Sequence, residues 1–199
     1  MSRFLTLAVA TLFAAAAAPQ AGHAQAQRQQ PPQQGQQATV ATGQQAMQQQ
    51  TVDESFIQAA AFSDHAEIRL GQLAAGQAEN AEVRRFGQRM VEDHTRSSQQ
   101  LATIAQQLGV TPPQQPDPGH QLERMALQQK SGEEFDRAYM MGQIRDHQRA
   151  VELFRFTSET ARSDELRGFA REALPILQEH LELAQELGQQ VGIRIVRAD

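Results

Sequence analysis

The sequence predicts an all-α protein built as a four-helix bundle. From about residue 52 onward, apolar residues recur with the 3.6-residue period of a helix and not with the two-residue period of a strand. Four such segments of about 25 residues follow one another. Short connections join the first segment to the second and the third to the fourth, whereas residues 109–132 form a long connection between the two pairs. Two antiparallel hairpins joined by one long crossover define the ferritin-like arrangement.

The first hairpin is expected from two amphipathic helices at about residues 52–77 and 81–108. In the first helix, Phe56 and Leu70 belong to a single apolar face. The second helix is expected to end at Gly109, because glycine commonly follows a helix C-terminus and two prolines come shortly afterwards. The few residues between the helices favour an antiparallel pair.

The second hairpin is expected over about residues 133–161 and 163–188. Pro175 lies inside the last apolar stripe and is expected to kink that helix or to divide it in two. The crossover 109–132 is long enough to run the length of the bundle, and a short helix is expected within it at residues 122–129. Such a connection would be unnecessary in a simple up-and-down bundle.

The N-terminus has the pattern of a secretory signal peptide over residues 1–26. A short apolar run, too short for a comfortable membrane span, follows Arg3. Ala24 and Ala26 fit the small-x-small cleavage rule, so cleavage is expected after Ala26, with a periplasmic or secreted product. The alternative is an uncleaved membrane anchor. No later run of 18 apolar residues exists, so no transmembrane span is expected after signal removal.

A glutamine-rich segment follows the signal. Half of residues 25–50 are glutamine, and Arg28 is their single charge. Little of this segment can be buried, so residues 27–51 are expected to form a disordered Gln/Pro-rich linker. The bundle is then expected over 52–190, with a C-terminal tail at 191–199.

Composition excludes several classes of function. The chain contains no cysteine, so it cannot form a disulfide, a thiol nucleophile, a Cys-ligated zinc site or an iron–sulfur cluster. Its net charge of −5 argues against a nucleic-acid-binding surface. No nucleophile elbow, phosphate-binding glycine loop or zinc-protease motif occurs, so no catalytic residue is assigned.

One polar constellation is expected in the core. Glu67, His94, His147 and His180 each lie in the centre of an apolar stripe and near the middle of a helix. In an antiparallel bundle, such mid-helix positions meet at one level. Burying these groups unpaired would cost several kcal/mol, so they must bind one another, water or a metal. Glutamate and histidine suit a divalent ion such as Fe, Zn or Mn.

Two interpretations of this layer stay open: a metal site and a metal-free, hydrogen-bonded core. Each histidine directly follows an acid, and such acids could orient a facing imidazole. The residues considered for that role are Asp93, Asp136, Asp146 and Glu179. The di-iron pattern of paired Glu-x-x-His motifs is absent, because Val91 and Leu177 stand three residues before His94 and His180.

Three stretches also carry a family resemblance: FIQAAAFSDHAEIRLGQLAAGQAENAEVRRFGQRMVEDHT, GEEFDRAYMMGQIRDHQRAVELF and LRGFAREALPILQEHLELAQEL. Together they resemble the DUF4142 family, exported bacterial proteins often labelled outer membrane or ferritin-like proteins. The resemblance covers about residues 52–188. It implies a ferritin-like four-helix fold and a periplasmic or envelope location, and it implies no reaction.

Three classes of function follow from the sequence. The first is an envelope protein that binds one divalent metal in its core layer. The second is a metal-free structural or stress-related interaction protein of the envelope, whose partners would be other envelope proteins or further copies of the chain. The third is a ferritin-like redox enzyme, which ranks last because the Glu-x-x-His pairs are missing.

Overall fold

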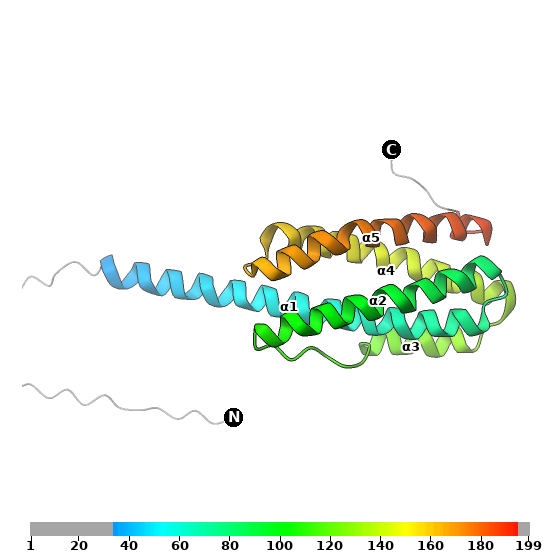
Figure 1. Ribbon diagram of the computed structural model, residues 1–199, viewed down its shortest axis with the longest axis horizontal. Helices are drawn as coiled ribbons and strands as arrows, with labels where there is room; N and C mark the ends of the chain where they lie inside the picture. The colour runs from blue at the N-terminus through cyan, green and yellow to red at the C-terminus, as the bar shows by residue number, and fades with distance from the viewer. Residues whose placement is uncertain (1–33, 195–199) are drawn as a thin grey trace, which may run out of the picture.

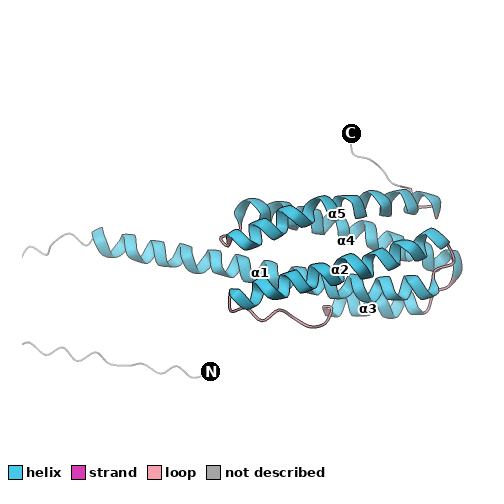
Figure 2. Cartoon of the chain, viewed as in Figure 1, coloured by secondary structure: helices cyan, strands magenta, loops and turns pink. Residues whose placement is uncertain are grey.

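The computed structural model describes residues 34–194, with side chains from residue 52 onward. Five helices make up this part of the chain: α1 Gln34–Gln77, α2 Ala81–Gln107, α3 Pro118–Gln128, α4 Gly132–Thr160 and α5 Asp164–Gln190. No strand occurs among the described residues (Figure 2). The predicted signal peptide, residues 1–26, lies outside the described residues.

The helices form two hairpins, as the sequence predicts. α1 packs along α2 and α4 packs along α5, while α1 also contacts α4 and α2 contacts α5. The short helix α3 lies on the outside of this four-helix bundle, against α1 and α4 (Figure 1). The crossover from α2 to α4 therefore includes one extra helix, and the fold is the ferritin-like four-helix bundle expected from the connection lengths.

α1 begins much earlier than predicted. Instead of starting near residue 52 it begins at Gln34, so residues 34–51 of the expected disordered linker are helical. This part of α1 projects beyond the rest of the bundle (Figure 1). Glutamine and alanine are good helix formers, and no proline follows Pro32 in this segment. A helix already nucleated in the bundle can extend through such residues at little cost.

Two proline positions bear on the expected helix boundaries: α5 is not divided at Pro175, and α3 starts earlier than expected. Pro175 lies inside α5, which continues unbroken from Asp164 to Gln190. The ring is exposed, and buried residues before and after it hold both halves of the helix against the core. α3 begins at Pro118, four residues before the expected start, because Asp117 caps it by accepting from the Gly119 N–H at 2.8 Å. Proline is well suited to the first helical turn, where its missing N–H is not needed.

A buried aspartate of α4 stabilises the turn between α1 and α2. Asp136 accepts from the backbone N–H groups of Glu79 at 3.0 Å and of Asn80 at 2.7 Å. The expectation that Asp136 orients a core histidine is therefore wrong: it lies one turn into α4, at the end of the bundle, where it satisfies turn N–H groups.

The turn between α4 and α5 is built in the same way. Asp53 of α1 accepts from the N–H groups of Arg162 and Ser163, both at 3.0 Å. Each hairpin thus supplies the aspartate that closes the turn of the other. These contacts place the start of α4 beside the end of α1, so that α1 and α4 are antiparallel.

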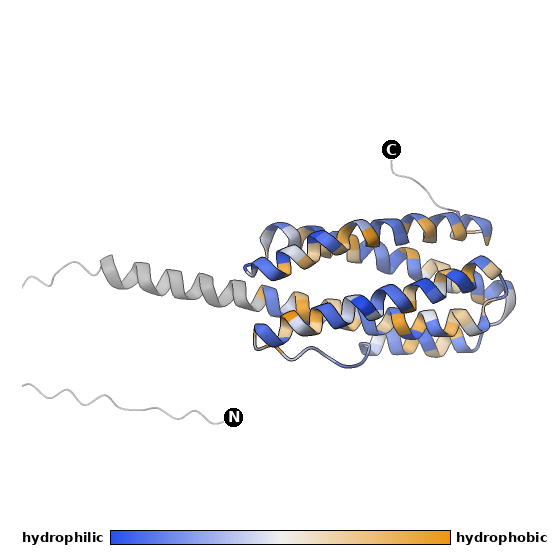
Figure 3. Cartoon of the chain, in the orientation of Figure 1, coloured by the Kyte–Doolittle hydropathy of each residue, from blue (hydrophilic) through white to orange (hydrophobic). Residues whose placement is uncertain are grey.

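The apolar core is divided into two clusters. One contains Phe56, Leu101, Phe154 and Phe169, and the other contains Leu70, Met90, Phe135 and Met140. All four long helices contribute to both, and hydrophobic and hydrophilic residues alternate along them as amphipathic packing requires (Figure 3). Between the clusters along each helix lie the buried polar residues of the predicted layer.

α1 and α2 approach each other closely at Gly71 and Gly87, which yields a first prediction. A Cβ added at Gly87 would lie 2.8 Å from the carbonyl oxygen of Gly71, a backbone atom that cannot rotate away. We expect Gly87→Ala to lower the free energy of unfolding by about 1–3 kcal/mol through overpacking. At Gly168 of α5 an added Cβ meets nothing within 4 Å, so Gly168→Ala is the matched control.

The measurement for this pair is urea unfolding followed by circular dichroism. Gly168→Ala should leave stability unchanged or raise it by up to about 1 kcal/mol, because alanine has the higher helix propensity. Equal effects of the two substitutions would contradict the close approach of α1 and α2.

Candidate metal centre

Three histidines from three helices meet in the middle of the bundle. His94 of α2, His147 of α4 and His180 of α5 are each at most 5% exposed. Their ring centroids are separated by 5.3 to 5.7 Å. Each ring offers one nitrogen, and the three nitrogens lie within 4.8 Å of one another. The convergence of these three histidines matches the sequence prediction.

A protein acceptor fixes the orientation of each imidazole. His94 donates from Nδ1 to Asp64 Oδ1 at 2.8 Å, and His180 donates from Nε2 to Asp93 Oδ2 at 2.9 Å. His147 donates from Nδ1 to the backbone carbonyl of Gln143 at 3.0 Å. Metal-binding histidines characteristically donate their second ring nitrogen to a carboxylate or a backbone carbonyl in this way.

The other nitrogen of each ring has no hydrogen-bond partner among the described residues. These atoms are His94 Nε2, His147 Nε2 and His180 Nδ1, and all three are buried. A buried polar atom without a partner costs about 1–3 kcal/mol. Three such atoms gathered in one layer are the arrangement expected of ligands for a shared ion.

Electrostatics keep two of the three rings neutral. Burial, together with the charges of neighbouring histidines, lowers the pKa of His147 and of His180 to about 3. Burial acts in the same direction on His94, but the hydrogen bond and charge of Asp64 outweigh it and the pKa of His94 is raised. Neutral imidazole is the form that binds metals, so two ligands are ready and the third must release a proton.

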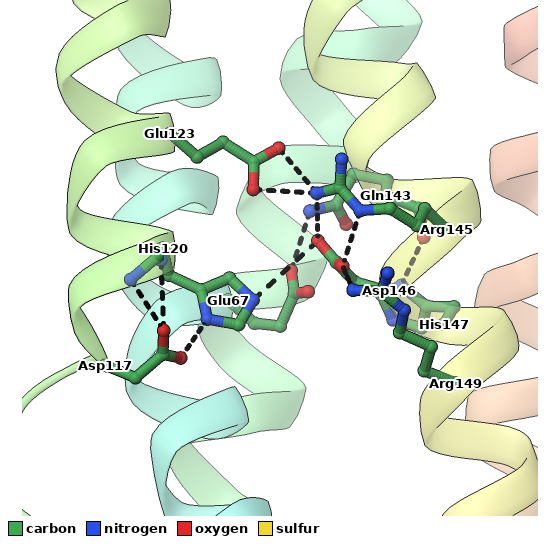
Figure 4. A network of polar contacts seen from close by, with 10 residues as sticks. Glu67, Asp117, His120, Glu123, Gln143, Arg145, Asp146, His147 and Arg149 are labelled. Atoms are coloured by element: carbon green, nitrogen blue, oxygen red, sulfur yellow. Dashed lines mark hydrogen bonds and ion pairs between the residues drawn. The ribbon is translucent and has the colours of Figure 1, made fainter.

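Glu67 shares the layer but lies outside the histidine cluster. Its side chain is 2% exposed and accepts from the Gln143 side-chain amide at 2.7 Å (Figure 4). Burial raises the pKa of Glu67, against the opposing influence of His94 and of the hydrogen bond from Gln143. The group whose ligand atoms converge consists of the three histidines without Glu67. A role for Glu67 as a ligand stays a prediction.

Only one of the four acids proposed from sequence contacts a histidine of this layer. Asp93 does so, although it binds His180 and not His94, which follows it in the chain. Glu179 pairs with Arg89 at 2.8 Å, on the surface of the bundle. Asp146 pairs with Arg145 at 3.0 Å and faces α3.

Sequence analysis missed Asp64 and Gln143, which position the histidine layer. Asp64 lies three residues before Glu67, and Gln143 lies four residues before His147. Helical residues three or four apart share a face, so this spacing was an available signal. Which acid contacts which ring depends on how the neighbouring helices are rotated, and the spacing carries no information about that.

A second cluster of metal-ligand types lies between α3 and α4. His120, Glu123 and Asp146 offer atoms within 4.8 Å of one another. Arg145 already bridges the two carboxylates, at 2.7 Å from Glu123 and 3.0 Å from Asp146 (Figure 4). These ion pairs explain the cluster as the contact that fastens the crossover helix to the bundle.

A pocket connects the histidine layer with the surface. Its volume is about 140 Å³, and its lining includes His94 and His180 as well as Asp64 and Asp93. His147 and Glu67 do not line it. The pocket therefore reaches two of the three histidines from one side of the bundle.

Fold and site together define a helical bundle with a layer of three histidines in its core, two held by carboxylates and one by a backbone carbonyl. The chain belongs to the family described as Domain of unknown function (DUF4142), whose model matches residues 36–187. No curated protein matches the chain.

Two solved structures share the fold. A DUF305 fragment from Deinococcus radiodurans superposes with a TM-score of 0.61 at 17% identity, over 69% of this chain and 96% of that one. A conserved hypothetical protein from Mycobacterium tuberculosis gives a TM-score of 0.54 at 18% identity, over 76% and 98% of the two chains. At such identities the similarity concerns the fold alone.

Membrane insertion was also considered. Within residues 34–194, no helix combines the length and the apolar character needed to span a bilayer.

Proposed function

We propose that this protein binds one divalent transition metal ion through His94, His147 and His180, and that it does so as an exported protein of the bacterial envelope. The observation that carries the proposal is the convergence of three buried imidazole nitrogens without partners, on rings whose other nitrogens are all fixed by acceptors. The envelope location is supported by the signal-peptide pattern of residues 1–26.

Three histidine ligands limit which metals the site would bind and which functions it would serve. Three imidazoles bind Zn²⁺ in a tetrahedral site whose fourth position is open, and imidazole also suits iron and manganese. A di-iron oxidase or iron store would need several bridging carboxylates, and none of the three converging ligands is one. Metal binding or buffering is therefore a better fit than ferritin-like redox catalysis.

The competing function is a metal-free structural or interaction protein whose polar layer sets the register of the helices. The hydrogen bonds from His94 to Asp64 and from His180 to Asp93 favour this function, because they satisfy one nitrogen of each ring without a metal. It leaves three buried nitrogens unpaired, at about 1–3 kcal/mol each. That cost favours the metal-binding function.

Metal titration tests the proposal directly. We expect untagged protein beginning at Gln27 to bind one equivalent of Zn²⁺ or Co²⁺ and to gain about 2.7 kcal/mol of stability at a free metal concentration of 100 Kd. The triple variant His94→Ala, His147→Ala, His180→Ala should bind none. His120→Ala, in the crossover helix, is the control and should bind normally.

Two measurements complete the design. Elemental analysis of the protein purified from its native envelope identifies the resident ion, and circular dichroism checks that each variant is folded. His147→Gln serves as a milder substitution if the triple variant unfolds. Wild-type protein without bound metal, and with no thermal shift on adding zinc, cobalt, iron or manganese, would leave the structural function as the better account.

A further inference from the structure

The pocket beside the histidine layer has a polar mouth and an apolar interior. Arg96, Gln100 and Glu172 line it and are solvent-exposed, which places the mouth between α2 and α5. Phe154, Phe169 and Leu177 are buried residues of its wall. The inner end is formed by His94 and His180, each at most 5% exposed. The pocket thus combines apolar wall residues with His94 and His180, two of the proposed metal ligands.

A metal ion held by the three histidines would have one coordination position left for another ligand. Three protein ligands leave a tetrahedral ion with one further position, which water or another small molecule occupies. Glu67 is absent from the pocket lining and accepts from Gln143. The nitrogens that would hold the ion are buried, and the pocket beside them is the route by which a ligand from solution would approach that further position.

Charge narrows the class of ligand. The charged residues that line the pocket are Asp64, Asp93, Arg96 and Glu172. Together they contribute three negative charges and one positive, which a divalent ion bound to neutral histidines would balance. An anionic ligand would add an uncompensated charge to a half-enclosed, largely apolar space, whereas an uncharged donor would not.

We propose that this pocket binds a small uncharged oxygen or nitrogen donor with an apolar body, which completes the coordination of the metal held by His94, His147 and His180. This proposal rests on the proposed metal function. A volume of about 140 Å³ is several times the roughly 10–15 Å³ that a single water molecule requires, so a ligand of a few heavy atoms fits. Imidazole has this size, an uncharged nitrogen donor and an apolar ring, and it is the probe of choice.

The test uses protein loaded with Co²⁺, whose visible absorption reports changes at the metal. Imidazole should change the spectrum in a saturable manner, while the cobalt content after gel filtration stays at one equivalent. Acetate, a small anionic donor, should bind at least tenfold more weakly at the same pH.

Blocking the pocket should remove the response without removing the metal. Ala173 of α5 lines the pocket, and Ala173→Phe is expected to weaken imidazole binding at least tenfold with the cobalt content unchanged. Ala102→Phe is the matched control, because Ala102 is exposed on α2 and does not line the pocket. Ala150→Leu narrows the pocket from α4 and replaces Ala173→Phe if that variant is unfolded.

The outcomes separate the two proposals. Absence of bound cobalt in folded wild-type protein overturns both. Stoichiometric cobalt with no spectral change overturns the ligand pocket alone, as does cobalt that imidazole strips from the protein. The same holds for an equal response in Ala173→Phe, or for acetate binding as strongly as imidazole.

Discussion

Lowering the pH from 6.5 to 4.5 is expected to reduce the free energy of unfolding of the metal-free protein, by up to about 5 kcal/mol. The cause lies in His147 and His180, whose pKa values are lowered to about 3, mainly by burial. In the unfolded chain both rings titrate near their ordinary pKa of 6.5. Below pH 6.5 the unfolded state therefore binds protons that the folded state does not.

The sign and size of this slope follow from linkage. Stability rises with pH wherever the unfolded state binds more protons, by about 1.4 kcal/mol per pH unit for each such group. The two histidines together give twice that value. Glu67 works in the opposite direction, because its raised pKa makes the folded state bind more protons above pH 4.5. The net slope is then smaller than that of the two histidines together.

The other two shifted groups of the histidine layer, His94 and Asp93, act outside this window. The raised pKa of His94 contributes stability that is fully present below pH 6.5 and is lost only as the pH rises through its folded value. The pKa of Asp93 is lowered by its hydrogen bonds to His180 and Arg89, which outweigh burial, so its contribution is lost only as the pH falls below the ordinary aspartate range.

Urea unfolding at pH 6.5, 5.5 and 4.5, in the presence of a chelator, measures the slope. Glu67→Gln removes the opposing titration and should bring the pH dependence to about 5 kcal/mol over the same range, the value expected for the two histidines alone. A free energy of unfolding that does not change between pH 6.5 and 4.5 in Glu67→Gln would mean that His147 and His180 are charged in the folded protein, contrary to their burial.

The parts of the fold that sequence predicts well are those fixed by periodicity. The four helices of the bundle and the level of His94, His147 and His180 follow from the 3.6-residue repeat and from the position of each residue along its helix. The start of α1 does not, because residues 34–51 carry no apolar stripe and their helix extends from the bundle through propensity alone.

The residues that hydrogen-bond to the histidine layer could be identified only from the structure. Asp136 is a buried acid on the core side of α4, yet it serves the turn at the end of the bundle. Asp93 reaches across from α2 to His180 on α5. Both roles depend on the packing between hairpins, on which a single helical period gives no information. Neighbours in sequence were therefore a poor guide to neighbours in space.

Removing the charge of an orienting carboxylate should weaken metal binding strongly. We expect Asp64→Asn and Asp93→Asn each to lower the affinity for Zn²⁺ or Co²⁺ by about 10–100-fold. Asp64 holds the ring of His94 and also accepts from the Ser97 hydroxyl at 3.0 Å, so the carboxylate is fixed before metal arrives. An amide in its place still orients the ring, but it supplies no negative charge to support an imidazole bound to a cation.

Asp136→Asn provides the matched control for these two substitutions. It makes the same chemical change at another buried aspartate, one that contacts turn N–H groups and no histidine of the layer. We expect it to lower the free energy of unfolding by about 1–3 kcal/mol and to leave metal affinity unchanged. Competition titration with a chromophoric chelator measures the three affinities, and urea unfolding measures the stabilities. If all three variants lose affinity in proportion to lost stability, the carboxylates support the fold alone; selective loss in Asp64→Asn and Asp93→Asn assigns them to the metal centre.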